Sequence, residues 1–174
     1  APQYASALGK TANCQTLVSL TLARGEVPVV LALRLFLPEN WTSDRARLKR
    51  AGVPAEYRTA RTKPEMALAE IDRNLRDFRT GDVHPIDPQL VDLLHDLKLK
   101  MRSKAPFEVI SGYRSPATNA QLASASGGVA RKSFHLRGMA IDIRLPDRNL
   151  RQLRKAALSL RRGGVGYYPK PDFV

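Results

Sequence analysis

The sequence predicts an α+β fold in which a small mixed sheet is flanked by helices. Short β-branched runs are bounded by glycine, proline or serine, and several polar caps are followed by apolar residues at helical spacing. The longest apolar stretch, Val27–Leu37, is interrupted by proline and arginine and is too short to cross a membrane. These observations favour a globular chain with α and β elements in separate segments.

Composition narrows the class of protein and of its partners. The 174 residues suit one ordinary domain or two small ones, and 43% hydrophobic residues with 26% charged ones are typical of a globular chain. The single cysteine, Cys14, excludes an internal disulfide and the multi-cysteine zinc modules. A net charge of +13 indicates a polyanionic environment such as nucleic acid, anionic lipid or cell-wall polymer.

We divide the chain into residues 1–73, which contain no histidine, and residues 74–174, which contain all three. In the first piece, the runs Leu17–Ala23 and Val27–Leu37 predict a hairpin, and Thr62 predicts the cap of a helix. A hairpin and a few helices bury little apolar surface. We therefore expect residues 1–73 to be part of a fold rather than an independent domain.

The second piece has clearer start and stop signals. Asp87 and Ser115 each precede a proline and are expected to cap helices, and Asn149 is expected to cap a third that Gly163 ends. Strands are expected at Phe107–Ile110, Ala140–Leu145 and Val165–Tyr168. This order of elements predicts one α+β unit over residues 74–174.

His135 and Asp142 form a candidate metal site. Asp142 lies in a strand that alternates apolar with small or polar residues, and Gly138 lets the chain turn back toward His135. A neutral imidazole and a carboxylate on adjoining segments are suitable zinc ligands. The alternative is a capping or surface histidine and an aspartate paired with Arg144, because this spacing alone is a weak pattern.

Other polar residues allow two interpretations each. Arg114 follows a strand end and could polarise a carbonyl or hold a carboxylate, or it could bind backbone carbonyls structurally. His84 and His95 are expected to be solvated, and Asp172 by itself is an ordinary polar residue.

A basic run near residue 155 could contact phosphates. It comprises Arg151, Arg154, Lys155, Arg161 and Arg162. No stacking aromatics are interleaved with these residues, so the run favours a solvated helix face over a nucleic-acid site.

Four blocks of residues 74–174, in order, resemble the murein endopeptidase branch of the D-alanyl-D-alanine carboxypeptidase-like zinc peptidases. They are FRTGDVHPID (78–87), VISGYRSPATN (109–119), SFHLRGMAIDIR (133–144) and GGVGYYP (163–169). The resemblance covers about a hundred residues and implies the fold of those peptidases and peptidoglycan cross-link peptides as substrate.

The resemblance also implies a zinc cofactor and roles for four residues. His135 and Asp142 become metal ligands, Arg114 stabilises the oxyanion, and Asp172 becomes the general base, three positions before a further histidine ligand. That histidine position follows Val174, so the chain as given is expected to bind zinc weakly and to be impaired as an enzyme. Such peptidases are exported, so the expected location is the periplasm or cell envelope, although no export signal is found in this chain.

Residues 3–73 resemble part of an insertion-sequence DDE transposase. The matching segments are ALGKTANCQTLVS (7–19), LFLPENW (35–41) and RTKPE (61–65). The resemblance implies a slice of a ribonuclease-H-like domain without its catalytic aspartates, so Asp44 and Asp72 are not assigned as metal ligands. The favoured hypothesis is a peptidase domain joined to a transposase fragment, and the alternative is a non-catalytic DNA-binding fragment.

Overall fold

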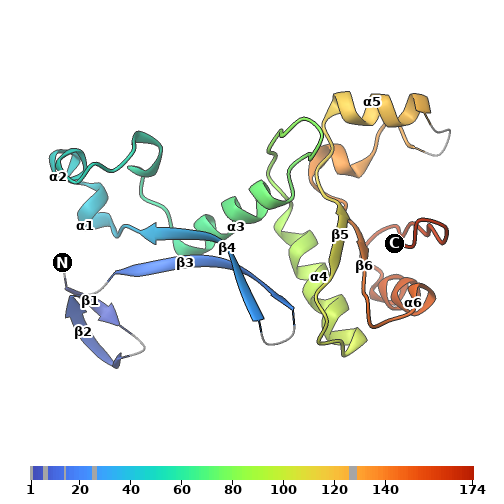
Figure 1. The fold of residues 1–174 in the computed structure, drawn as a ribbon, viewed down its shortest axis with the longest axis horizontal. Helices are drawn as coiled ribbons and strands as arrows, with labels where there is room; N and C mark the ends of the chain where they lie inside the picture. The colour runs from blue at the N-terminus through green and yellow to red at the C-terminus, as the bar shows by residue number, and fades with distance from the viewer. Residues whose placement is uncertain (1, 6–7, 14, 25–26, 126–128) are drawn as a thin grey trace. The chain divides into compact units, whose positions relative to one another are not determined.

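The computed structural model describes residues 2–5, 8–13, 15–24, 27–125 and 129–174. The chain divides into two compact units, one of residues 1–22 and 29–67 and the other of residues 23–28 and 68–174 (Figure 1). The chain passes from one unit to the other within β3 (Thr16–Arg24), within β4 (Val27–Phe36) and within helix α3 (Lys63–Asn74).

The N-terminal elements include two separate two-stranded sheets. Strand β1 (Pro2–Ala5) pairs antiparallel with β2 (Lys10–Asn13), and β3 (Thr16–Arg24) pairs with β4 (Val27–Phe36). The β3–β4 pair confirms the expected hairpin, whose turn at residues 25–26 lies outside the described residues; the β1–β2 pair was not expected. Short helices follow at α1 (Glu39–Thr42), α2 (Arg45–Arg50) and the 3₁₀ turn η2 (Ala55–Tyr57).

The expected capping box at the start of α3 is confirmed. The Thr62 amide donates to Oε2 of Glu65 at 2.6 Å, and the Glu65 amide donates to the Thr62 hydroxyl at 3.3 Å. These hydrogen bonds satisfy two amides that would otherwise lack partners at the helix start, and the backbone contact lowers the pKa of Glu65.

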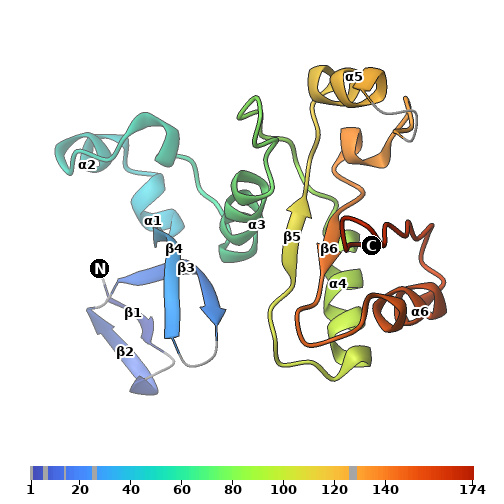
Figure 2. The ribbon, with the colours of Figure 1, turned by 45° about the vertical axis from the view of Figure 1, so that its right-hand side comes forward.

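The second unit contains the remaining elements. They are α4 (Pro88–Met101), β5 (Glu108–Ser111), α5 (Pro116–Ala125), the 3₁₀ turn η3 (Phe134–Arg137), β6 (Asp142–Arg144) and α6 (Leu150–Leu160). Strands β5 and β6 pair antiparallel and lie side by side in Figures 1 and 2, and α4 packs against α6. This arrangement confirms the mixed α+β class.

One hydrophobic core holds the helices against β6. Its buried members are Leu97, Ile143, Leu145, Leu153 and Val174. Because Ile143 points into this core, its strand neighbours Asp142 and Arg144 lie on the opposite face. The alternation expected from the sequence therefore has a physical cause, although β6 is shorter than the predicted Ala140–Leu145 strand.

One predicted helix end and one predicted strand are wrong. Helix α6 ends when Arg161 itself adopts a left-handed conformation (φ 53°), two residues before the expected stop at Gly163. The predicted strand Val165–Tyr168 does not form; Tyr168 makes a single antiparallel bridge to Phe173. The helix caps at Asp87, Ser115 and Asn149 are confirmed by side-chain hydrogen bonds from the first-turn amides.

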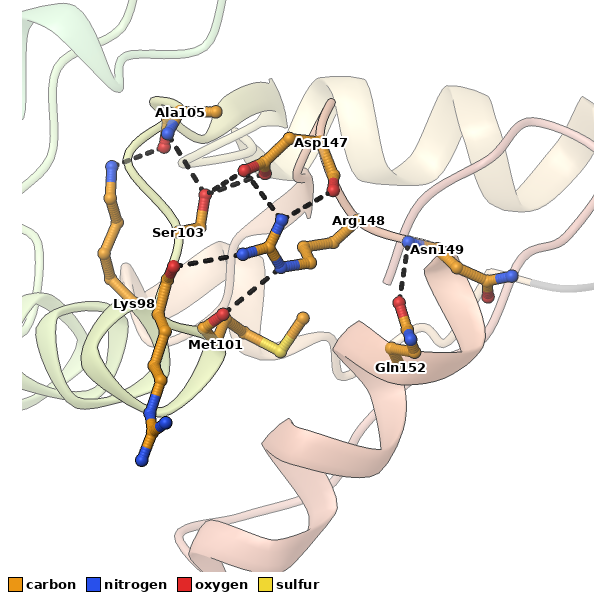
Figure 3. A network of polar contacts seen from close by, with 9 residues as sticks. Lys98, Met101, Ser103, Ala105, Asp147, Arg148, Asn149 and Gln152 are labelled. Carbon is orange, nitrogen blue, oxygen red and sulfur yellow. Dashed lines mark hydrogen bonds and ion pairs between the residues drawn. The ribbon is translucent and has the colours of Figure 1, made fainter.

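A polar network joins the end of α4 to the start of α6 (Figure 3). The Arg148 guanidinium donates to the carbonyls of Met101 and Arg102, and the Ser103 hydroxyl donates to the Asp147 carboxylate. These contacts satisfy carbonyls that the helix leaves without partners. The network therefore holds the segment after β6 against α4. No helix in the described ranges combines the length and apolar character that a membrane span requires.

Candidate functional site

The imidazole of His135 and the carboxylate of Asp142 face each other in the second unit. His135 lies on η3, where the Ser133 hydroxyl accepts from its amide, and Asp142 begins β6. Nε2 of His135 is 3.3 Å from Oδ1 of Asp142, and both side chains are largely buried. His135 and Asp142 therefore lie next to each other, as the sequence predicts.

The other ring nitrogen determines what His135 presents to Asp142. Nδ1 lies 2.7 Å from the Gly112 carbonyl, which can only accept, so Nδ1 must carry its hydrogen. In the neutral ring, Nε2 then points a lone pair at a carboxylate oxygen. Two facing acceptors are stable only with a proton or a cation between them.

The pair fits two positions of a tetrahedral zinc shell. Ligand atoms at bond lengths near 2.0–2.1 Å lie about 3.3 Å apart in a tetrahedron, which is the separation found here. The Nδ1 contact to a backbone carbonyl is the orienting bond that ligating histidines usually make. Among the described residues, no group of three histidine, cysteine or acidic side chains is placed to hold a metal.

Arg114 completes the cluster from the end of β5. One guanidinium nitrogen lies 3.4 Å from Oδ2 of Asp142, and the side chain is 12% exposed. Its Nε is buried and has no hydrogen-bond partner, while its backbone amide donates to the His135 carbonyl at 3.1 Å. A buried donor without a partner is costly in free energy, so this guanidinium has donor capacity for a bound group.

Asp142 pairs with Arg114 rather than with Arg144, so the alternative pairing considered from the sequence is wrong. Arg144 is two residues further along β6, and its guanidinium lies 3.3 Å from Glu108 and 4.0 Å from Asp172. The antiparallel β5–β6 register places Glu108 directly opposite Arg144, which explains this choice of partner.

Asp172 stands apart from the cluster. Its side chain is 61% exposed, its backbone is left-handed (φ 58°), and its recorded ion pair is with Arg144. The segment around it is held firmly, because Phe173 pairs with Tyr168 and the buried Val174 exchanges two backbone hydrogen bonds with Ile143.

Gly138 makes the approach of His135 to Asp142 possible. Its φ of 64° is left-handed, and a Cβ there would stand 2.3 Å from the Pro85 carbonyl oxygen. The Gly138 carbonyl also accepts from the Asp87 amide at 3.0 Å. Only glycine permits this conformation at this approach distance.

The two remaining histidines differ from each other. His95 is exposed on α4, as expected. His84 is half-buried and stacks on Tyr113 with ring centroids 4.7 Å apart, so it is partly rather than fully solvated. Burial, reinforced by the charges of Asp82 and Asp77, raises the pKa of Tyr113.

His135 and Asp142 line a cleft of about 620 Å³. Much of its wall is apolar and comes from α4, from residues 139–143 and from residues 163–168. Arg162 at this cleft pairs with Asp96, and Arg154 lies over the Tyr167 ring, so part of the basic helix face is engaged within the unit.

Comparison with known proteins decides the family. The family model described as peptidoglycan L,D-endopeptidase MepK matches residues 49–174. The chain belongs to this family. The peptidoglycan L,D-endopeptidase MepK of Escherichia coli strain K12 is 43% identical over 122 residues, which are 70% of this chain and 67% of that protein. The probable MepK of Haemophilus influenzae is 40% identical over 120 residues, 68% of this chain and 64% of that protein.

A second match concerns the N-terminal region. The model described as DDE superfamily endonuclease matches residues 1–86, so it overlaps the MepK match over residues 49–86. Both resemblances stated from the sequence are confirmed. No solved structure matches the chain significantly. Peptidases of the M15 type, to which the MepK model belongs, generally use zinc.

The buried Asp77, in the MepK-like region, was not singled out from the sequence. Asp77 is 2% exposed, and its carboxylate accepts from the amides of Ser115 at 2.8 Å and Arg79 at 2.9 Å. No local pattern indicates it, because Ser115 is 38 positions away. The FRTGDVHPID block, which begins one residue later, was the nearest signal.

Proposed function

We propose that residues 74–174 form a zinc-dependent peptidase domain that hydrolyses peptide bonds in peptidoglycan cross-links. The observation that carries the proposal is the His135–Asp142 pair, with Nε2 and Oδ1 3.3 Å apart and Nδ1 bound to a carbonyl. The relatives' name gives the bond class as L,D. The substrate, if shared with them, places the protein at the cell envelope.

In this proposal His135 and Asp142 hold the metal through the two facing atoms. Bound zinc would polarise the scissile carbonyl and lower the pKa of a coordinated water. The pair also fits a cation for an electrostatic reason, since the lone pair and the carboxylate oxygen repel each other without one.

Arg114 is the proposed electrophilic group. Its guanidinium is held beside Asp142 by the 3.4 Å contact, and its buried Nε has no partner in the protein. A fixed donor in a site largely closed to water stabilises the oxygen that becomes negative during attack on the carbonyl. The same donor would orient the substrate carbonyl before the reaction.

Asp172 is the proposed proton acceptor, on the strength of the family resemblance. Its segment runs beside β6, since Val174 and Ile143 exchange hydrogen bonds in both directions. Its carboxylate, 4.0 Å from Arg144, remains mostly exposed and accessible to water.

The same register supports a third ligand from the position after Val174. In an antiparallel pair, the neighbours of Ile143 and Val174 face each other, so that position would lie opposite Asp142 with its side chain on the same face. We therefore define the extended chain as residues 1–174 followed by one histidine. A histidine there would complete three protein ligands and leave an open position.

The test compares residues 1–174 with the extended chain. Zinc stoichiometry is measured on both, together with chelator-sensitive release of soluble peptides from purified murein. We expect one tightly bound zinc and robust release for the extended chain, and weak zinc binding with little release for residues 1–174. An extended chain that binds no zinc, or whose release is insensitive to a chelator, contradicts the proposal.

The DDE match supports a second candidate, DNA binding without cleavage by the N-terminal region. Binding of the full chain to duplex DNA at several salt concentrations tests it, and loss of binding on alanine substitution within residues 1–73 is the expected result.

A further inference from the structure

A buried carboxylate, that of Asp77, lies outside the candidate metal pair of His135 and Asp142. Asp77 is 2% exposed, and in the described part of the chain no lysine or arginine side chain lies within ion-pair distance of it. A buried charge without an ionic partner is expensive unless hydrogen bonds compensate for it. The groups that bind this carboxylate therefore indicate its role.

Backbone amides supply that compensation. Oδ2 of Asp77 accepts from Ser115, the cap of α5, and Oδ1 accepts from Arg79. Burial alone would raise the pKa of Asp77, but the neighbouring Thr118 hydroxyl, the amide and hydroxyl of Ser115 and the Arg79 amide hold it well below its usual range. The carboxylate is therefore ionised and faces the amino end of α5, where negative charge is favoured.

Residues 75–77 and 112–115 are held together at three points. The Tyr113 amide donates to the Leu75 carbonyl at 2.8 Å, and Ser115 donates to Asp77. Gly112 abuts Leu75 so closely that a Cβ on the glycine would stand 2.5 Å from the Leu75 oxygen. Arg114 lies between two residues whose amides are both bound by this segment.

Two residues of the 112–115 segment, Gly112 and Arg114, contact the candidate metal pair of His135 and Asp142. The Gly112 carbonyl accepts from Nδ1 of His135, and the Arg114 amide donates to the His135 carbonyl. A displacement of residues 112–115 would therefore change the orientation of the His135 ring and the distance from Arg114 to Asp142 together.

We propose that Asp77 is a positioning residue: by holding the Ser115 amide, it sets where Arg114 stands beside Asp142 and how Gly112 orients His135. The catalytic consequence rests on the proposed function, whereas the positioning itself does not. Two donor amides converge on the carboxylate, so asparagine, with one acceptor and an NH₂ group, can satisfy one of them and must oppose the other.

The first experiment uses residues 1–174 and needs neither zinc nor activity. Asp77→Asn is compared with Asp72→Asn, a matched control because Asp72 also accepts from a backbone amide, that of Ile86 at 2.8 Å. Amide hydrogen exchange is measured at Arg114 and Ser115, and long-range proton–nitrogen spectra report the ring hydrogen of His135.

Asp77→Asn should accelerate exchange of the Ser115 and Arg114 amides at least about tenfold and shift the His135 ring signals. Asp72→Asn should leave all three unchanged. Unchanged Arg114 and His135 signals in folded Asp77→Asn, or equal changes in both variants, overturn the positioning role.

The second experiment measures murein hydrolysis by the extended chain. Asp77→Asn should lower kcat roughly tenfold to a hundredfold with a smaller effect on KM, because misplacement of a group that acts at the transition state costs rate. In an Arg114→Ala background the same substitution should lower kcat by a smaller factor, because only the route through Gly112 and His135 remains. Equal losses in both backgrounds show that Asp77 does not act through Arg114.

The two experiments separate the two proposals. If the extended chain neither binds zinc nor hydrolyses murein, the proposed function is wrong. The exchange and ring signals still decide whether Asp77 positions Arg114 and His135. An active extended chain whose Asp77→Asn variant keeps full kcat overturns the catalytic consequence of the positioning and leaves the proposed function intact.

Discussion

The β3–β4 and β5–β6 pairs show that strand length does not decide how firmly a sheet is held. Strands β3 and β4 have nine and ten residues, yet Leu31, Leu33 and Leu35 on β4 are 42–51% exposed. Strands β5 and β6 have four and three residues, yet Ile143 on β6 is 3% exposed because it packs into a core with residues of α4 and α6.

The contrast shows that a rigid site needs a strand whose apolar side chains are buried. Burial of apolar side chains, rather than the number of strand hydrogen bonds, supplies most of the stabilisation that holds side chains in place. Asp142 begins the short, covered strand, and His135 and Arg114 reach it from neighbouring segments of the same unit. The following predictions test or refine this contrast.

The largest effect should come from the metal pair. His135→Ala and Asp142→Ala in the extended chain should each abolish stoichiometric zinc binding and reduce murein hydrolysis to background, since each removes a protein ligand. His95→Ala is the matched histidine control, because His95 is exposed on α4. Zinc content and peptide release are the measurements, and tight zinc binding by either ligand variant would mean that other side chains form the site.

The next largest effect should be a difference in protease resistance between residues 1–73 and residues 74–174. Limited digestion should cut within residues 1–73 and leave a resistant fragment that begins near Asn74, because the hydrophobic core lies in the second unit. Mass spectrometry of the products identifies the boundary. Equal protection of both regions, with one cooperative unfolding transition, would contradict this prediction.

Gly138→Ala should destabilise the second unit by more than about 2 kcal/mol, because a left-handed backbone and a collision with Pro85 add together. Gly81→Ala is the control, since Gly81 has φ 78° with nothing within 4 Å of an added Cβ, and it should cost only the strain of about 1–2 kcal/mol. Urea unfolding measures both variants. Similar losses of unfolding free energy in the two variants would show that Pro85 moves away from the added Cβ at little cost.

Acid should weaken the second unit through Asp77. Its folded pKa lies below the ordinary value, so its stabilising contribution is complete above the unfolded pKa near 3.9 and is lost as the pH falls toward the folded pKa. Asp77→Asn should therefore flatten the decline in unfolding free energy below about pH 4. Urea unfolding at a series of pH values checks this, and parallel curves for the two proteins would refute it.

The smallest effects should come from two matched capping boxes. Thr62→Ala at α3 and Asn149→Ala at α6 each remove the side-chain oxygen that accepts from a first-turn amide, and each should cost about 1 kcal/mol of local helix stability. The Asn149 variant should lower the cooperative unfolding midpoint of the second unit, because α6 carries Leu153, which is fully buried in the core. Amide exchange within each helix reports the local cost, and a larger global effect for Thr62→Ala would reverse the contrast.

Much of the local structure could be predicted from the sequence. Thr62, Asp87, Ser115 and Asn149 all cap helices as expected, because capping depends on residues within one turn. Predictions failed where a distant segment decided the outcome. Val174 rather than residues 165–168 exchanges backbone hydrogen bonds with Ile143, and stacking on Tyr113 partly covers His84.

The family could be predicted from four short blocks of the sequence. The candidate pair of His135 and Asp142 and the turn at Gly138 between them could be predicted from residue types within one of these blocks. The tertiary structure decided which charges meet. Arg114 reaches Asp142 across 28 positions and Asp77 reaches Ser115 across 38, and Arg144 pairs with Glu108 through the β5–β6 register. Contacts between distant segments depend on how the core packs, and no local spacing encodes that packing.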